Sequence, residues 1–91
     1  MSDSGAYSLE FTDSARDDLK KLDRVIASRI YKKLMWLAEN VEAIDHESLT
    51  GNLANYYKYR IGDYRVIYDL DWEGRIVIVA VIGHRSRVYD E

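Results

Sequence analysis

Apolar positions in the first half of the chain recur at the spacing of a helix. Residues 7–11 alternate apolar and polar side chains, which predicts a half-buried strand. Beyond them, apolar residues follow at steps of three or four as far as residue 41, a stripe typical of amphipathic helices that bury one face. The stripe consists of Phe11, Ala15, Leu19, Leu22, Ile26, Ile30, Leu34, Leu37 and Val41.

Two capping signals divide this helical stretch. Thr12 or Asp13 can begin a first helix and Asp23 a second, because short oxygen-bearing side chains accept hydrogen bonds from the free N–H groups of a first turn. Residues 13–43 contain no glycine or proline, so periodicity alone also permits one continuous helix. Such a helix would be unusually long for a small domain, and we therefore predict a helical hairpin that divides near residues 22–24.

The second half of the chain has the pattern of β-strands. Residues 44–55 are predicted as a connecting loop, followed by strands at 56–61, 64–70 and 75–82. The last strand is apolar on both faces, so we expect it at the buried centre of the sheet, ended by Gly83. An N-terminal strand, a helical hairpin and an antiparallel three-stranded meander define an α+β domain. Its helices pack on one face of a single sheet, and the other face stays partly open.

The first two strands of the meander place cations on one face of a hairpin. Gly62-Asp63 is typical of a two-residue type II′ loop, which sets Arg60 directly opposite Arg65. Lys58 joins them on that face because side chains alternate along a strand. The other side or rim receives Tyr57, Tyr59 and Tyr64. Like charges that face each other cost stability, so the opposed arginines indicate a site for an anion such as phosphate.

Length and composition limit the class of protein. The 91 residues fit one small domain, residues 1–91, of which 1–6 are expected to form a loose tail. Cysteine is absent and the two histidines lie outside any ligand cluster, so we predict no disulfide, metal or other cofactor. With no apolar leader or membrane-length run, a soluble cytosolic protein is the expectation.

A net charge of −3 argues at first sight against a nucleic-acid partner. The distribution of charge weakens that argument, because residues 1–51 carry the whole excess of acid and residues 52–91 are balanced. Within the second half, acids gather around the second turn and at the C-terminus. The cations there include Lys58, Arg60, Arg65, Arg85 and Arg87. A local basic patch can therefore exist on an acidic protein.

The segment after Gly83 adds further candidates. If it stays extended, Arg85, Arg87 and Tyr89 share one side. Guanidinium groups suit phosphate oxygens and aromatic rings stack on unpaired bases, so the combination suggests single-stranded RNA. Any one of these residues alone is more typical of a solvated surface. It is their conjunction with the hairpin that favours a site.

Other chemically capable residues have structural interpretations. His84 lies beside a glycine at a strand end and is more typical of a hydrogen-bonded structural residue than of a general acid or base. His46 lies in the polar loop and is expected at the surface. Trp36 and Met35 lie on or beside the helical stripe and are interpreted as core or partner-facing residues.

Four segments carry a resemblance to a known family. They are residues 7–11 followed by Ala15, Leu19 and Leu22, the Leu49-x-Gly51 loop, residues 57–68, and Gly83-His84-Arg85-x-x-x-Tyr89. In these segments the chain resembles the RelE family of toxins from bacterial toxin–antitoxin systems, within the RelE/ParE superfamily. The resemblance covers essentially the whole chain, and the hairpin and final segment are specific as a pair.

The resemblance implies a ribosome-dependent endoribonuclease, an mRNA interferase. Such an enzyme cleaves mRNA in the ribosomal A site by attack of a 2′-hydroxyl on the adjacent phosphate, which leaves a 2′,3′-cyclic phosphate. The resemblance also implies a cognate RelB-like antitoxin that wraps the toxin in a hetero-oligomer and displaces the terminal segment or covers the basic face. An amphipathic helix in an apolar groove is the expected contact.

Site residues are implied by position. Lys58 falls on one of two active-site lysines of the family, Arg65 and Arg85 on its phosphate-stabilising and leaving-group arginines, and Tyr89 on its C-terminal tyrosine. These four are the predicted catalytic residues. The reaction needs a base for the 2′-hydroxyl, cations for the transition state and an acid for the leaving oxygen.

One departure from the family concerns the second lysine, where this chain has Arg60. An arginine stays protonated, so it can clamp a phosphate but is a poor base. Lys58 is thus the candidate base, with His84 in reserve, and the predicted substrate-binding residues are Arg60, Arg87 and His84. The acidic overall charge also departs from the basic family norm, which bears on affinity for the ribosome rather than on site chemistry.

Two alternative functions stay open. A ParE-like toxin that inhibits DNA gyrase would share the scaffold without needing the cationic cleft. A binding module with weakened catalysis is compatible with the lysine-to-arginine change at position 60. Codon preference, activity on free RNA and the identity of the antitoxin lie beyond the sequence.

Overall fold

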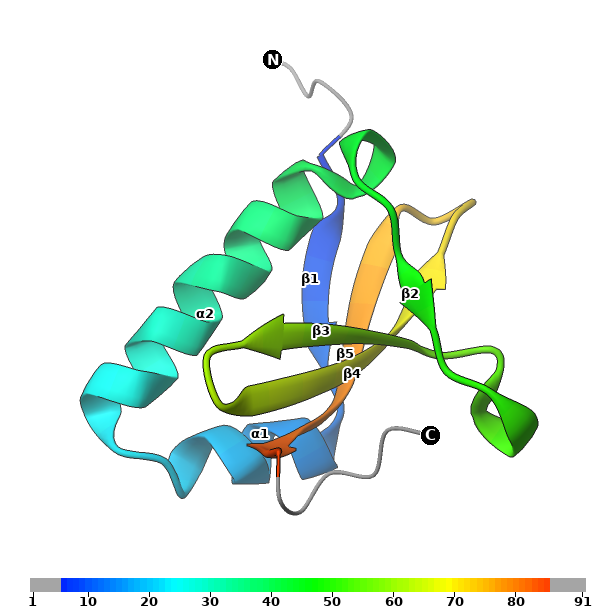
Figure 1. The fold of residues 1–91 in the computed structure, drawn as a ribbon. Coiled ribbons are helices and arrows are strands. Elements are labelled where there is room, and N and C mark those ends of the chain that lie inside the picture. The colour runs from blue at the N-terminus through cyan, green and yellow to red at the C-terminus, as the bar shows by residue number, and fades with distance from the viewer. Residues whose placement is uncertain (1–5, 86–91) are drawn as a thin grey trace.

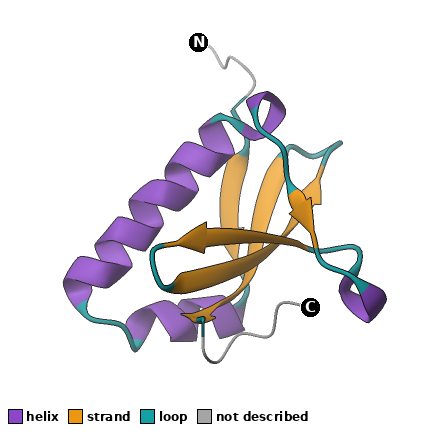
Figure 2. Cartoon of the chain, viewed as in Figure 1, coloured by secondary structure: helices purple, strands orange, loops and turns teal. Residues whose placement is uncertain are grey.

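The structure, a computed structural model, describes residues 6–85 apart from the side chain of Leu53. Across these residues the chain forms an α+β fold, in which two helices accompany a five-stranded sheet of order β1-β5-β4-β3-β2 (Figures 1 and 2). Its elements are β1 (Ser8–Phe11), α1 (Asp13–Lys20), α2 (Arg24–Glu39), β2 (Glu47–Ser48), β3 (Tyr57–Ile61), β4 (Tyr64–Asp71) and β5 (Ile76–His84). Single 3-10 turns occupy Val41–Ala43 and Gly51–Leu53.

Side-chain caps begin both helices. Thr12 Oγ1 accepts a hydrogen bond from the Ala15 N–H at 3.1 Å, and Asp23 Oδ2 accepts one from the Val25 N–H at 3.0 Å. Each cap satisfies an N–H group that has no partner within its own helix. The Thr12 hydroxyl also donates to the Ala80 carbonyl at 3.0 Å, which ties the start of α1 to β5. The predicted helical hairpin is confirmed.

The helical stripe and one face of the sheet enclose a single hydrophobic core. Ile30, Leu34 and Leu37 of α2 are fully buried. Val66, Tyr68 and Leu70 of β4 belong to the same core, at the two-residue period of a strand, and Ile67 between them is also buried. The edge of the core is formed by partly buried side chains, namely Leu9, Phe11, Leu19, Leu22, Ile26, Ile44, Tyr57, Tyr59 and Tyr64.

The sheet differs from the predicted meander in three details. β1 pairs in parallel with β5, so β5 is an interior strand but β4 occupies the middle of the sheet. β2, within the predicted loop 44–55, is a two-residue strand that pairs antiparallel with β3. Finally, β5 continues through Gly83 to His84. Gly83 was predicted to end the strand, but it stays paired with Arg65 of β4, and a glycine weakens a strand without breaking a ladder that its neighbour supports.

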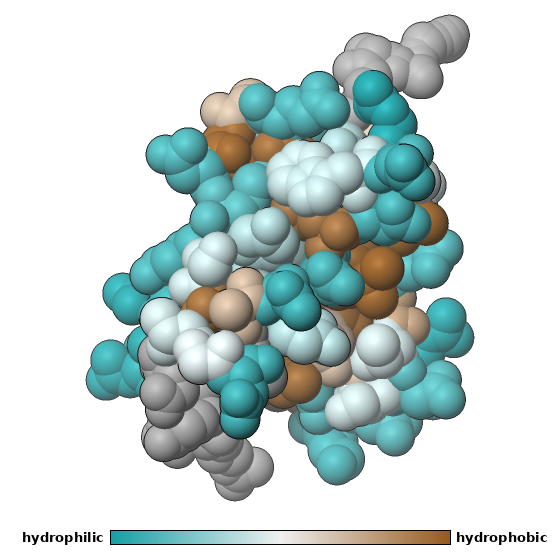
Figure 3. Space-filling model, turned by 90° about the vertical axis from the view of Figure 1, so that its right-hand side faces the viewer, coloured by the Kyte–Doolittle hydropathy of each residue, from teal (hydrophilic) through white to brown (hydrophobic). Residues whose placement is uncertain are grey.

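A bulge in β5 sets which residues share a face near its end. Ile67 pairs with Val81, whereas Tyr68 pairs with Val79, so Ala80 is the extra residue. Because of this shift, Val81 and Gly83 lie on the same face as Ile67 and Arg65. On the side of the molecule opposite α2, apolar side chains are visible between hydrophilic ones (Figure 3).

The predicted tail at residues 1–6 lies outside the described residues except for Ala6, which is exposed. Within residues 6–85, no helix combines the length and apolar character needed to span a membrane.

Candidate functional site

The hairpin of β3 and β4 has the predicted loop and register. Gly62 has a φ of 58°, while Asp63 is not among the residues with positive φ, and this combination is that of a type II′ turn. Ile61 pairs with Tyr64, and Arg60 lies directly opposite Arg65. The opposed arginines inferred from the sequence are therefore confirmed.

Three cations share the face of this hairpin that points away from the helices, and we call them the cationic face: Lys58, Arg60 and Arg65. Alternation places Lys58 and Arg60 on the side of β3 opposite Tyr59, which packs toward the core. Arg60 is exposed, and the other two side chains are half-buried. Opposite Arg65 on β5 stands Gly83, which adds no side chain over this face.

Lys58 has an acidic neighbour that no sequence pattern indicates. β2 pairs Glu47 with Lys58, and Lys58 Nζ lies 3.6 Å from Glu47 Oε2. The Lys58 side chain is 18% exposed, whereas that of Glu47 is 70% exposed, so the carboxylate lies on the solvent side of the pair. An ion pair whose carboxylate is open to water adds little to stability, and its interest is chemical.

Arg85 follows β5 and lies beside the loop of the same hairpin. Its backbone N–H donates to the carbonyl of Asp63 at 2.8 Å, which fixes residue 85 beside the loop that joins β3 to β4. The Arg85 residue is exposed. The other candidates of the final segment, Arg87 and Tyr89, lie outside the described residues.

His84 is not on the cationic face. It pairs with Tyr64 across β4 and β5, and the two rings meet edge to face with centroids 5.5 Å apart. Tyr64 packs against the hydrophobic core, so its paired neighbour lies on that face too. The structure thus places Lys58, Arg60 and Arg65 on one face, residue 85 beside the loop that joins β3 to β4, and His84 on the other face.

His46 is not the free surface residue that the sequence led us to expect. Its Nδ1 lies 2.6 Å from the hydroxyl of Tyr68, and its Nε2 lies 2.7 Å from the carbonyl of Val41. A carbonyl only accepts, so Nε2 donates, and in the neutral ring Nδ1 accepts from the tyrosine. The half-buried ring also contacts the rings of Tyr57 and Trp72. Both nitrogens are thus engaged, and His46 holds the segment that carries Glu47 against the sheet.

Tyr68 is suited to donate that hydrogen bond. It is buried in the core, and burial raises the pKa of its hydroxyl above the ordinary value, with Tyr57 and Tyr59 adding to the effect. Burial likewise raises the pKa of Tyr59. The Tyr68 hydroxyl therefore stays protonated at neutral pH and can serve as the donor to His46.

Comparison with known proteins shows the family of this chain. A family model described as "ParE toxin of type II toxin-antitoxin system, parDE" matches residues 9–89. Toxin RelG of Mycobacterium tuberculosis is 31% identical over 84 residues, covering 91% of this chain and 95% of the relative. The mRNA interferase toxin RelE of Escherichia coli is 33% identical over 89 residues, covering 94% of this chain and 93% of the relative.

Solved structures show the same fold. The toxin–antitoxin complex RelBE2 of Mycobacterium tuberculosis matches with a TM-score of 0.82 and 28% identity, covering 94% of this chain and 99% of that chain. The isolated Escherichia coli RelE toxin matches with a TM-score of 0.70 and 28% identity, covering 87% and 84%. Fold and sequence thus define the class, a toxin of a type II toxin–antitoxin system. Within that class, the chain belongs to the RelE/ParE family and is similar to its RelE-type members.

Proposed function

We propose that this toxin is a ribosome-dependent mRNA interferase that cleaves mRNA in the ribosomal A site. The observation that carries the proposal is the direct opposition of Arg60 and Arg65. The Escherichia coli relative named as an mRNA interferase supports the choice of substrate. A gyrase-directed toxin has no comparable use for a cationic face of this kind.

The electrostatics of the cationic face favour a transition state of phosphoryl transfer. Two guanidinium groups at directly paired positions repel each other, and a bound phosphate removes that repulsion. Attack by the 2′-hydroxyl adds negative charge to the phosphorus-bound oxygens as the transition state forms. Preorganised cations therefore stabilise the transition state more than the bound substrate, which is what accelerates a reaction. The proposal assigns this role to Arg60 and Arg65.

Proton transfer is assigned to the Lys58 end of the face. Lys58 Nζ lies 3.6 Å from Glu47 Oε2, so an amine nitrogen and a carboxylate oxygen stand side by side as candidate proton acceptors. Two routes follow. In the first, the substrate displaces Glu47, Lys58 releases its ammonium proton to solvent, and the neutral amine then accepts the 2′-hydroxyl proton. In the second, the Glu47 carboxylate accepts that proton while Lys58 contributes positive charge. Both routes use groups that lie 3.6 Å from each other, a separation at which both can contact one ribose.

The remaining roles belong to the final segment. Residue 85 is held beside the hairpin loop, so Arg85 is proposed to bind the same phosphate and to assist departure of the 5′-oxygen. Arg87 and Tyr89 keep their proposed roles in substrate binding and catalysis. His84 is proposed to support the hairpin through Tyr64, because its ring packs there rather than beside the cations.

The proposal includes a protein partner and a place of action. Structures of related toxins include the complexes RelBE2 of Mycobacterium tuberculosis and RelBE of Escherichia coli. By analogy, a RelB-like antitoxin is proposed to neutralise this chain in a hetero-oligomer. Its substrate is mRNA on translating ribosomes, so the cytoplasm is the proposed location.

Primer extension on a translated message, after induction without a partner, tests this function. We expect discrete cuts within codons for the unmodified protein. Lys58→Ala should lose them, because the side chain beside the reacting ribose is gone. The exposed Lys20→Ala on α1 is the matched control and should cut normally. Full cleavage by Lys58→Ala would remove Lys58 from the mechanism. An intact message together with inhibited gyrase supercoiling would favour the ParE-like alternative.

A further inference from the structure

The bulge in β5 brings an apolar side chain onto the face of the sheet that carries the cations. Val77 and Val79 are fully buried in the core, so strict alternation along the strand would bury residue 81 as well. Because Ala80 is the extra residue of the bulge, Val81 lies on the opposite face, where it is 36% exposed, and Ile82 returns to the core. Bulges occur often next to active sites, where they redirect a side chain.

Two rows of paired residues cross this face from β3 to β5. The row next to the hairpin loop consists of Arg60, Arg65 and Gly83, and the row behind it of Lys58, Ile67 and Val81. Val81 is thus the diagonal neighbour of Arg65, a separation of about 7–8 Å between Cα atoms in a regular ladder. One nucleotide spans a comparable distance between its phosphate and its base.

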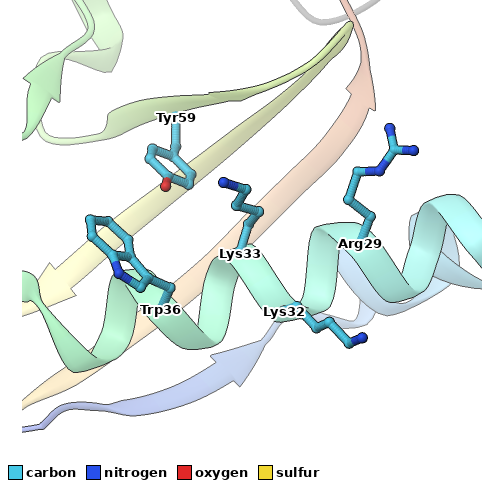
Figure 4. A pocket seen from close by; sticks show the side chains of 5 residues that line it. All are labelled: Arg29, Lys32, Lys33, Trp36 and Tyr59. Carbon is cyan, nitrogen blue, oxygen red and sulfur yellow. The ribbon is translucent and has the colours of Figure 1, made fainter.

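The β5 end of these rows is apolar, and we call its three residues the base floor: Ile67, Val81 and Gly83. Ile67 is buried in the surface of the sheet, and Gly83 contributes backbone alone beside Arg65. Tyr59 points from the other side of β3 toward Trp36 of α2 (Figure 4). The base floor therefore lies on the face of the sheet that α2 does not cover.

Charged residues of β4 bound the base floor at its two ends. Alternation places Arg65 before Ile67 and Asp69 after it on this face. Asp69 is half-buried, and its Oδ1 accepts a hydrogen bond from the Leu70 N–H at 2.8 Å. A phosphate is attracted to the arginine end and repelled from the aspartate end. A nucleotide on this face would thus place its phosphate at Arg65 and its base over Ile67 and Val81.

We propose that the base floor receives a purine base of the RNA strand whose phosphate is bound by Arg60 and Arg65. The choice of RNA as the ligand rests on the proposed function. The side chains of the base floor carry no hydrogen-bonding group, so it distinguishes bases by the ring area that they bury. A purine should bind about threefold more tightly than a pyrimidine, the factor that about 25 Å² of additional apolar area provides.

The size and surroundings of the base floor favour a base over a protein segment. Its exposed apolar part is one valine beside the backbone of a glycine, whereas a standard protein interface buries about 800 Å² on each partner. Arginines at directly paired positions next to it suit the phosphate of a nucleotide, and the base of that nucleotide supplies the flat apolar group. One ligand thus satisfies both halves of the face.

Titration of the isotope-labelled full chain with short single-stranded oligonucleotides tests the proposal without cleavage. The probes are 2′-O-methyl oligoadenosine, 2′-O-methyl oligouridine and an abasic strand with the same number of phosphates, and the first two lack the attacking 2′-hydroxyl. We expect intermolecular NOEs between adenine protons and the Val81 methyl groups. The oligoadenosine should bind about threefold more tightly than the oligouridine. The abasic strand should shift the Val81 methyl resonances less than either.

Variants separate the base floor from binding of phosphate in general. Val81→Ala should remove most of the preference for oligoadenosine, because the ring loses its apolar contact. Val25→Ala is the matched control, since Val25 is a 66% exposed valine on α2, and it should keep the preference. Gly83→Ala adds a methyl group on the base floor and should weaken binding of oligoadenosine. Circular dichroism and thermal unfolding confirm that each variant is folded.

Several results would overturn the proposal. These are a preference for oligoadenosine that survives Val81→Ala, equal shifts of Val81 with the abasic strand, and no binding of oligoadenosine by wild type. Failure of the nuclease proposal is visible separately, because primer extension on a translated message would then show no cuts while the NOEs to Val81 persist. Where cleavage occurs, Val81→Ala should raise KM for adenosine codons and leave kcat unchanged.

Discussion

His46 and Tyr68 illustrate how single residues position the site. The histidine joins the carbonyl of Val41 to the hydroxyl of a buried tyrosine in β4. The next residue in the chain, Glu47, reaches the ammonium group of Lys58. A hydrogen-bonded clamp in the connecting segment thus sets the position of a carboxylate at the candidate site.

The first prediction at this scale concerns Tyr68→Phe and its dependence on pH. The change leaves Nδ1 of His46 without its donor and should lower the free energy of unfolding by about 1 kcal/mol at neutral pH. Burial raises the pKa of Tyr68 in the folded protein. As pH rises past about 10, the tyrosine therefore loses its proton in the unfolded chain while it still keeps it in the folded protein. Unfolding becomes more favourable as a result. Urea unfolding between neutral and alkaline pH should show a shallower loss of stability in Tyr68→Phe than in wild type. An equal loss of stability with rising pH in wild type and Tyr68→Phe would contradict this prediction. Tyr56→Phe is the matched control.

A second residue-scale prediction addresses the carboxylate beside Lys58. If Glu47 accepts the proton, Glu47→Gln should slow cleavage of ribosome-bound mRNA about a hundredfold and remove the acidic limb of its pH–rate profile. Stability should change by less than about 0.5 kcal/mol, because the Glu47 carboxylate lies on the solvent side of the pair. Glu73→Gln, in the exposed turn before β5, should behave as wild type. An unchanged profile in Glu47→Gln would assign proton transfer to Lys58.

What the sequence predicts at this scale depends on the range of each contact. Alternation along two adjacent strands places Lys58, Arg60 and Arg65 correctly, because a short hairpin loop fixes their register. Glu47 and His46 escape prediction because a two-residue strand is too short to show a period. Their partners also lie far along the chain, as the contact of His46 with Tyr68 shows.

At the scale of elements, the hairpin depends on one backbone conformation. Gly62 has positive φ, a region that costs other residues about 1–2 kcal/mol. Space is not the constraint, because a Cβ added at Gly62 would meet nothing within 4 Å. Gly62 therefore matters for its backbone conformation, which the hairpin loop needs to set Arg60 opposite Arg65.

Gly62→Ala tests this link, and the chain offers a matched control. Gly51 also has positive φ and an equally open Cβ position, but it lies before β3, at the other end of the strand from the hairpin loop. Both alanine variants should lose about 1–2 kcal/mol in urea unfolding. Under conditions where both are folded, only Gly62→Ala should also lose mRNA cleavage. Equal cleavage by the two variants would show that the site tolerates changes in the loop.

The elements themselves divide into those that local pattern predicts and those that it does not. The capped helices follow from Thr12, Asp23 and the apolar stripe, which are local signals. The parallel pairing of β1 with β5 joins segments from opposite ends of the chain, and only the packed core selects it. The continuation of β5 past Gly83 likewise depends on its neighbour in the sheet rather than on its own sequence.

The whole molecule keeps two basic surfaces on an acidic chain. The cationic face lies on the side of the hairpin away from the helices. The second surface is formed by Arg29, Lys32 and Lys33 of α2, in a hollow that Tyr59 lines from the opposite side of β3. This separation keeps the proposed RNA site on one side of β3 and the cations of α2 on the other. It also explains why net charge alone is a poor guide to the partners of this protein.

The most direct measurement is the single-turnover rate at which purified protein cleaves mRNA on programmed ribosomes, with Arg65→Ala compared against wild type. Arg65 faces Arg60 across the hairpin, so its loss should remove transition-state stabilisation and slow cleavage about a hundredfold or more. Arg16→Ala, which removes an exposed arginine of α1, should cleave at the wild-type rate. If Arg65→Ala also cleaves at the wild-type rate, the opposed arginines do not act on the scissile phosphate.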